Sequence, residues 1–274
     1  MEIIQKSEAF KRVDGEMKFS YVRVFVTEDG ILYTGKWTNR FELPKKLDDL
    51  HEIKQIPTKD RGPEVKNQAW SAVYIKTPSL LSYIDGNLEK QITREVETCE
   101  ILRRNPHPNI ATYYGYNESN GRVAGLCFKR YKSTLLEAVN PQYLGKAAFR
   151  SSARDLVREN LISGLDGILA GIGHLHSLGL VHNDINPANI MIDDDDSLIL
   201  IDFGSCRYIG ESLRNTETKR THHWHDPSVD ISLERNDLNA FEDLQIWLAG
   251  SEDEKFLLND GINVMSERID EWVI

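Results

Sequence analysis

Two short polar stretches constrain the fold of this chain more than any other feature. Residues 181–190 read Val-His-Asn-Asp-Ile-Asn-Pro-Ala-Asn-Ile, and residues 202–204 read Asp-Phe-Gly after the apolar run 198–201. Carboxylate and amide side chains therefore occur at fixed offsets, in turns flanked by β-branched apolar residues. Such turns suit a fold that presents oxygen ligands beside a nucleotide and its metal ions.

The pattern H-x-D-x-x-x-x-N followed by D-F-G resembles the catalytic loop and metal-binding turn of the eukaryotic protein kinases. The resemblance covers residues 19–248 and implies an α+β, two-lobed protein-kinase-like fold. Its N-lobe would be an antiparallel β-sheet with one main helix, and its C-lobe reduced and mainly helical. It also implies that Asp184 is the catalytic base and that Asn189 and Asp202 ligate Mg²⁺ beside ATP. The layout is similar to a group of short kinase-like proteins from filamentous fungi.

A β-rich run over residues 72–76 ends in Lys76 and resembles the kinase V-A-I-K strand, whose lysine holds the α- and β-phosphates. A helix is expected next, because apolar residues recur at helical spacing from residue 92 to residue 102. By resemblance, Glu97 on this helix pairs with Lys76, and Glu100 is the second choice. Without the resemblance, Lys76 is a solvated lysine and Glu97 forms an exposed pair with Arg94.

Two β-hairpins are predicted in the amino-terminal half. Alternating runs within residues 19–36 meet across Glu28-Asp29-Gly30, and a second pair of runs spans residues 111–128. The resemblance places the phosphate-binding loop in the first hairpin, but the pattern G-x-G-x-x-G is absent there. We therefore expect the nucleotide phosphates to be held less tightly or by other groups.

The end of the second hairpin is expected to line a nucleotide cleft. By resemblance, Phe128 guards the back of the adenine pocket, and Lys129, Arg130 and Tyr131 form the hinge whose backbone groups bind adenine. Met191 is assigned to the same nucleotide site. A plain core position would explain Phe128 equally well.

Further helices are predicted towards the carboxyl end. A long amphipathic helix is expected over residues 151–178, and a capping box at residues 134–137 is expected to open a short helix. Asp237 resembles the buried aspartate that supports the kinase catalytic loop from beneath, although a plain helix N-cap would use the same residue. His182 and Phe203 are expected to pack rather than to act in acid–base chemistry.

Three departures from the kinase pattern limit the activity that we expect. Asn183 replaces the arginine that reads a phosphorylated activation loop in many kinases. Asn186, which we still assign to the catalytic residues, replaces a lysine, and an uncharged amide cannot balance the charge of the transferred phosphoryl group. Residues 221–227 lack the A-P-E of the usual substrate-binding turn, and their three histidines are spaced too tightly to favour a closed metal site.

Composition restricts the partners and the location. The net charge of −10, without a basic run interleaved with aromatic residues, argues against nucleic acid as a partner. No apolar run is long enough to span a bilayer, so no membrane association is expected. Three cysteines without C-x-x-C spacing fit a reducing compartment. We expect a cytoplasmic protein, and a nuclear location is also compatible.

Four segments are expected along the chain. Residues 1–18 form an N-terminal extension, and residues 19–131 form the N-lobe and hinge, with an irregular insertion at about 40–67 indicated by its prolines and charges. Residues 132–250 form the reduced C-lobe, and residues 251–274 form an acidic tail.

Three functions fit these residues. The first hypothesis is an ATP- and Mg²⁺-dependent phosphotransferase of protein-kinase type that acts, slowly, on a Ser or Thr hydroxyl of an unknown protein substrate. The second is a pseudokinase or nucleotide-binding interaction module, supported by the missing Gly-rich loop, Asn186 and the short C-lobe. The third is a small-molecule phosphotransferase, because the H-N-D form without the lysine also resembles choline-kinase and aminoglycoside-phosphotransferase loops.

Overall fold

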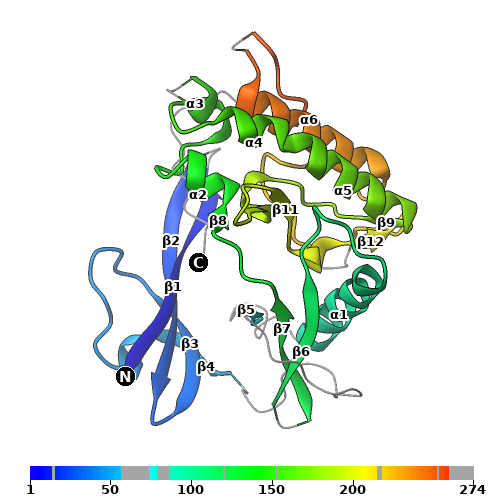
Figure 1. The fold of residues 1–274 in the computed structure, drawn as a ribbon. Coiled ribbons are helices and arrows are strands. Elements are labelled where there is room, and N and C mark those ends of the chain that lie inside the picture. The colour runs from blue at the N-terminus through cyan, green and yellow to red at the C-terminus, as the bar shows by residue number, and fades with distance from the viewer. Residues whose placement is uncertain are drawn as a thin grey trace. The chain divides into compact units, whose positions relative to one another are not determined.

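The computed structural model describes residues 1–13, 16–56, 74–78, 87–119, 121–151, 154–214, 218–251 and 253–258, and they form two compact units. The first unit holds the described residues up to 56, and the second holds nearly all the others. Figure 1 shows the first as the blue strands and the second as the cyan to orange elements.

The first unit is a four-stranded antiparallel sheet in the order β1-β2-β3-β4 (Figure 1). Its strands are β1 (Glu2–Val13), β2 (Glu16–Glu28), β3 (Ile31–Trp37) and β4 (His51–Gln55). The predicted hairpin between β2 and β3 is confirmed. Its turn has positive φ at both Asp29 (52°) and Gly30 (75°), as a tight hairpin turn with the right-handed twist of its strands requires.

Alternating valines build the core of this sheet. Val22, Val24 and Val26 of β2 are buried together with Leu50, which follows the short 3₁₀-helix η1 (Leu47–Asp49). Successive side chains on a strand point to opposite faces, so the three valines share one face. That face carries the core cluster of the unit, and the fully buried Phe25 shows that the opposite face of β2 is covered at that position as well.

One prediction for this region needs correction. The stretch 40–67 was predicted to be irregular, but His51–Gln55 pairs with β3 as strand β4. All five side chains of β4 are exposed, and the sequence shows no apolar alternation that would predict the strand. The strands of the 19–36 hairpin, where the resemblance places the phosphate-binding loop, pair with β1 and β4. A role of this hairpin in phosphate binding stays a prediction. Residues 57–67 of the predicted insertion lie outside the described part.

The second unit begins with a three-stranded antiparallel sheet in the order β5-β7-β6. Its strands are β5 (Tyr74–Lys76), β6 (Tyr113–Ser119) and β7 (Arg122–Phe128). The predicted helix is confirmed as α1 (Leu88–Arg104), which lies between β5 and β6 in the sequence. The second predicted hairpin is confirmed by the antiparallel pairing of β6 with β7.

Short helices and strands make up the rest of this unit. The capping box predicted at Thr134 is confirmed, because the Glu137 N–H donates to Thr134 Oγ1 and the Thr134 N–H donates to Glu137 Oε2. The elements are β8 (Ser133–Thr134), α2 (Leu135–Val139), α3 (Lys146–Ser151), α4 (Glu159–Ser163), α5 (Leu165–Ser177), β9 (Leu180–Val181), η3 (Pro187–Asn189), β10 (Ile190–Ile192), β11 (Leu198–Leu200), η4 (Phe203–Ser205), β12 (Arg207–Tyr208) and α6 (Glu234–Ala249).

The single helix predicted over 151–178 is wrong in its first half. The structure has a non-helical turn before α4, and Gly164 separates α4 from α5. Leu161, Ile168 and Ile172 of the predicted helix are buried, whereas Leu156 is half exposed and Leu169 is also exposed. The apolar period therefore predicts only part of the face that packs on α6, β9 and β11.

Helix α6 is buried along much of its length beside α5 (Figure 1). Two of its carboxylates, Asp237 and Asp243, are completely buried. Because a buried carboxylate is costly unless it is hydrogen-bonded or paired, both positions indicate specific partners. In the described part of the chain, no helix has the length and apolar character that crossing a membrane requires. Residues 259–274 of the predicted acidic tail lie outside that part.

Candidate active site

The loop between β9 and η3 is supported by Asp237 of α6. Its two carboxylate oxygens accept the backbone N–H groups of His182 (2.8 Å) and Asn183 (2.7 Å), as the resemblance implied. The alternative, a helix N-cap, does not apply because Leu233 occupies the N-cap position of α6. His176 Nε2 lies 3.0 Å from the same carboxylate. Asp237 thus fixes the backbone on which the polar loop residues sit.

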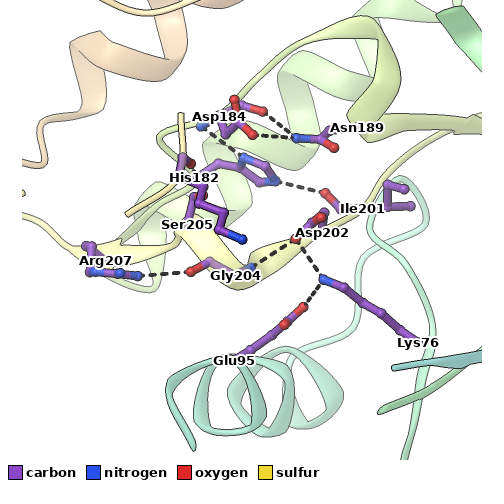
Figure 2. Close-up of polar contacts among 11 residues, drawn as sticks. Lys76, Glu95, His182, Asp184, Asn189, Ile201, Asp202, Gly204, Ser205 and Arg207 are labelled. Carbon is purple, nitrogen blue, oxygen red and sulfur yellow. Dashed lines mark hydrogen bonds and ion pairs between the residues drawn. The ribbon is translucent and has the colours of Figure 1, made fainter. Parts of the chain in front are cut away.

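The imidazole of His182 has a packing role, as predicted. It is fully buried, its Nε2 lies 2.9 Å from the carbonyl oxygen of Ile201, and its ring meets the Phe203 ring edge-on at 5.8 Å between centroids. Figure 2 shows the ring between the loop and the Asp-Phe-Gly turn. The contacts join these two segments and leave the histidine no free access to a substrate.

Asp184 and Asn189 face each other across the loop (Figure 2). The Asn189 amide nitrogen donates to both the backbone oxygen and Oδ2 of Asp184, each at 2.9 Å. Its amide oxygen accepts no hydrogen bond from the described residues. Asn189 therefore positions Asp184 with one end of its amide and has an oxygen left for a cation.

Lys76 connects two carboxylates that are far apart in the sequence. Its Nζ lies 2.6 Å from Glu95 Oε1 on α1 and 2.8 Å from Asp202 Oδ1 in the Asp-Phe-Gly turn (Figure 2). Asp202 adopts a left-handed backbone conformation (φ 62°), and its Oδ1 also accepts the Gly204 N–H at 3.2 Å. A cation and a carboxylate from different elements thus meet within the second unit.

The prediction that Glu97 pairs with Lys76 is wrong. Glu97 is exposed, and the second choice, Glu100, pairs instead with Arg103. Glu95 takes the predicted place because residues 95 and 97 point to opposite sides of a helix with 3.6 residues per turn. The apolar period of α1 could have predicted Glu95, because the buried residues Ile92, Cys99 and Leu102 lie on the same side of the helix as Glu95.

The three charges shift one another's pKa values. Partial burial acts to lower the pKa of Lys76, but the carboxylates of Asp202 and Glu95 together outweigh it, and the pKa is raised. For Asp202, partial burial acts to raise the pKa, whereas the charge and hydrogen bond of Lys76 lower it to about 2. Burial, with the nearby charge of Asp202, raises the pKa of Glu95, although Lys76 acts to lower it. Asp202 is therefore ionised at any ordinary pH, as a metal ligand must be.

The donor set suits a magnesium ion. Asp202 Oδ2 accepts no hydrogen bond among the described residues, and its side chain is 43% exposed, so solvent reaches it. One carboxylate oxygen and the amide oxygen of Asn189 are the few protein ligands that Mg²⁺ takes when phosphates and water supply the rest. These two residues could hold the ion beside Lys76.

Asn186 and Thr221 complete the surroundings of Asp184. Asn186 Nδ2 donates to Asp184 Oδ1 (3.1 Å) and to Thr221 Oγ1 (3.0 Å), and the Thr221 N–H donates to Asp184 Oδ1 at 2.8 Å. Burial raises the pKa of Asp184, although the hydrogen bond from Thr221 acts against the shift. Sequence patterns assign Thr221 no role of its own, because its contact with Asp184 joins residues 37 positions apart.

The predicted hinge follows β7. The Lys129 N–H donates to the Thr112 carbonyl and the Tyr131 hydroxyl accepts the Thr112 N–H, both at 3.0 Å. The Lys129 carbonyl and the Tyr131 N–H bond to none of the described residues, and their pairing with adenine stays a prediction. The guanidinium of Arg130 lies over the Tyr74 ring at 5.9 Å from its centroid.

Two apolar residues assigned to the nucleotide site occupy different settings. Phe128 is buried and packs against Tyr113 at 5.4 Å between ring centroids, which fits a core residue as well as a pocket wall. Met191 lies in β10, paired with Thr134 on one side and Ile199 on the other, and is partly buried. Their contact with a nucleotide remains a prediction.

The side chain of Asn183 forms hydrogen bonds with uncharged groups only, as far as the described residues show. Its side chain is buried, donates to Ser232 Oγ at 2.9 Å and accepts from Asn236 Nδ2 at 3.0 Å. Both partners belong to the region where α6 begins. The loop is therefore tied to the helix by uncharged groups where many kinases carry an arginine.

The three histidines of the 221–227 segment do not gather into a metal site. His225 Nδ1 lies 2.8 Å from the Thr221 carbonyl oxygen. The rings of His222 and His223 meet edge-on, with 3.9 Å between their centroids. In the described ranges, no group of three or more His, Cys, Asp or Glu residues is arranged to hold a metal ion.

Comparison with known proteins gives consistent matches. A sequence profile described as "Protein kinase domain" matches residues 65–248. The probable serine/threonine-protein kinase kinX of Dictyostelium discoideum is 30% identical over 207 residues, which cover 72% of this chain and 17% of that protein. The stress-activated protein kinase JNK of Suberites domuncula is 30% identical over 105 residues, which cover 38% of this chain and 28% of that protein. The chain thus matches less than a third of the length of either relative. The profile match starts after the β1–β4 sheet.

Proposed function

Because the chain belongs to the protein kinase domain family, we propose that it transfers the γ-phosphoryl group of ATP to a hydroxyl group, with Mg²⁺ as its metal ion. One observation carries the proposal: Lys76, Glu95 and Asp202 converge within hydrogen-bonding distance, although Lys76 and Asp202 are 126 residues apart. A lysine oriented by one carboxylate beside a second, ionised carboxylate is the arrangement that phosphoryl transfer uses to hold a triphosphate.

Each side chain has a separate task in this reaction. Lys76, held by Glu95, orients the α- and β-phosphates, and Asn189 and Asp202 hold the metal ion. When bound, Mg²⁺ neutralises charge on the phosphate oxygens. Asp184 orients the attacking hydroxyl and accepts its proton. A pKa raised by burial makes Asp184 a better proton acceptor than an ordinary aspartate.

A Ser or Thr hydroxyl of a protein is the substrate that we propose. Support comes from the names of the relatives, one of which is described as a probable serine/threonine-protein kinase. We expect slow transfer, because Asn186 contributes hydrogen bonds but no positive charge beside Asp184. The likeness to short fungal kinase-like proteins and the identity of the substrate remain predictions.

A second candidate is a nucleotide-binding module that transfers no phosphate. It is favoured by the surroundings of Asp184, whose Oδ1 already accepts two hydrogen bonds and whose Oδ2 accepts one from Asn189. A substrate hydroxyl must compete with the Thr221 N–H for this carboxylate. Transfer to a small molecule is a third candidate, and it differs from the first only in the acceptor.

Nucleotide binding and phosphate transfer can be tested separately. We expect ATP with Mg²⁺ to raise the melting temperature of the protein, because a ligand that binds only the folded state stabilises it. Asp202→Asn should abolish the shift, whereas Asp166→Asn, which changes an exposed carboxylate on α5, should preserve it. The absence of any shift at millimolar nucleotide would contradict nucleotide binding.

Transfer is then followed with γ-labelled ATP. Label should reach the protein itself or a generic protein substrate slowly, and Asp184→Ala should abolish the incorporation. Binding without any labelling of proteins would favour the second candidate. Labelling confined to a panel of metabolites would favour the third.

A further inference from the structure

Lys146 of α3 is a buried lysine with an unusual set of neighbours. Its ammonium forms an ion pair with Asp243 of α6 and donates to the carbonyl oxygen of His223 at 2.8 Å. The ammonium also lies 4.4 Å from the centroid of the Trp224 ring and 4.6 Å from that of Phe256. Two anionic or carbonyl oxygens and two aromatic faces thus surround one positive charge.

Burying this ion pair costs desolvation free energy that apolar side chains at the same positions would not cost. The side chain of Lys146 is 5% exposed and that of Asp243 is completely buried. Replacing a buried ion pair by apolar residues is often neutral or stabilising, whereas removing one partner is strongly destabilising. A buried pair at this place therefore indicates a demand for a specific geometry rather than for stability.

The geometry in question is that of the 221–227 segment. His223 has a left-handed backbone (φ 63°), which is unfavourable for a residue with a side chain, and Lys146 holds its carbonyl directly. Two residues earlier, the Thr221 N–H contacts Asp184 Oδ1. The hydrogen bond from Lys146 therefore fixes the same short turn that reaches the proposed catalytic base.

Aromatic contacts connect the 221–227 segment to the core. Trp224 meets Trp247 of α6 edge-on at 6.1 Å between centroids, and Trp247 stacks on Phe149 of α3 at 4.2 Å. Helices α3 and α6 therefore hold the 221–227 segment through one continuous group of rings.

The chain beyond α6 completes the surroundings of Asp243. The N–H groups of Leu257 and Leu258 donate to its two oxygens at 2.6 Å and 3.0 Å. Asp243 thus accepts hydrogen bonds from the 256–258 segment while it pairs with Lys146. Moving that segment would leave the carboxylate under-bonded and would loosen the lysine.

We propose that Lys146 is a positioning residue for substrate binding, which holds the 221–227 segment in place through His223, and that residues 256–258 secure Lys146 through Asp243. The substrate-binding role of the segment rests on the function proposed above. The mechanical link from residues 256–258 to His223 does not, because it is a set of contacts that can be tested without activity.

Limited proteolysis tests the link. Trypsin can cut after Lys219 and Arg220, which directly precede the segment. The rate of cleavage reports how firmly the segment is held. We expect Lys146→Met to accelerate cleavage there by about tenfold or more, because removing one partner of a buried ion pair leaves an unpaired buried charge and is strongly destabilising. Lys90→Met, the same change at an exposed position of α1, should leave the rate unchanged.

Two further variants keep the result interpretable if Lys146→Met folds poorly. Lys146→Arg keeps the charge and should restore much of the protection. Leu257→Pro removes one N–H donor to Asp243 without changing any charge, and it should also accelerate cleavage after Arg220. Wild-type rates of cleavage in both Leu257→Pro and a folded Lys146→Met would overturn the proposal.

Kinetics then separate this proposal from the proposed function. In an active protein, Lys146→Met should raise KM for the protein substrate and leave KM for ATP unchanged. An equal rise in both would indicate general damage and contradict a positioning role. If the wild type transfers no phosphate, the proposed function fails, while the proteolysis result still decides the link from residues 256–258 to His223.

Discussion

Lys76 Nζ lies 2.6 Å from Glu95 Oε1, although Glu97, two residues later on the same helix, is the residue that the resemblance to kinases suggested. The choice follows from helix geometry, because Glu95 shares the buried side of α1 and Glu97 faces solvent. The pair therefore provides a direct test of the site with a matched control two positions away.

Glu95→Gln should weaken ATP binding by about tenfold to a hundredfold, because a hydrogen bond to a charged group contributes about 1.5–3 kcal/mol. Glu97→Gln should bind ATP as the wild type does. Nucleotide titration of both variants measures the difference. Equal losses in the two variants would mean that Glu95 has no special role in orienting Lys76.

The pair between Lys76 and Asp202 should make stability depend on pH in the acid range. The pKa of Asp202 is lowered from 3.8 to about 2 in the folded protein, so the pair contributes stability above pH 3.8 and loses it as the pH falls towards 2. Urea unfolding of the wild type and Asp202→Asn should therefore give a difference that is constant near neutrality and shrinks below about pH 4. A difference that grows on acidification would contradict the lowered pKa.

Asn183→Ala should destabilise the protein by about 1–3 kcal/mol, because one buried and one partly buried partner each lose a hydrogen bond. The partners are Ser232 and Asn236. Denaturant unfolding of Asn183→Ala, Asn236→Ala and the double variant gives the coupling energy, which we expect to be clearly different from zero for residues in contact. Strict additivity would show that the contact contributes nothing.

Gly125→Ala should displace the strand that carries Lys76. A Cβ atom at residue 125 would lie 2.6 Å from Ile75 Cγ2 and 2.9 Å from the backbone oxygen of Lys76, so β5 must move. We expect a loss of about 1–3 kcal/mol in stability, as for other overpacked sites, together with weaker ATP binding.

Gly173→Ala is the matched control, because nothing lies within 4 Å of the added atom on α5. It should stabilise the protein by about 0.5–1 kcal/mol, since alanine favours a helix more than glycine does. Thermal unfolding and nucleotide titration of both variants measure these effects. Unchanged ATP affinity in Gly125→Ala would show that β5 can shift without moving Lys76.

Local patterns in the sequence predicted much of the second unit. The alternation that gives β6 and β7, the apolar period of α1 and the capping box at Thr134 depend on neighbours within a few residues, so they can be read directly from the sequence. The roles of the oxygen-bearing residues of the loop and of the Asp-Phe-Gly turn come instead from the resemblance to the kinase motifs. The exposed strand β4 was missed because only its pairing with β3 makes it a strand.

The sequence by itself determined which chemical groups the protein has and their order along the chain: Lys76, Asp184, Asn189 and Asp202. The tertiary structure decided which groups meet. It selected Glu95 for Lys76, set Thr221 against Asp184, and enclosed Lys146 with Asp243 and His223. These contacts join residues from 19 to 97 positions apart, and their partners are chosen by packing and by the cost of leaving a buried charge unpaired. A local period in the sequence cannot predict these partners, because it contains no information about which distant residues pack together.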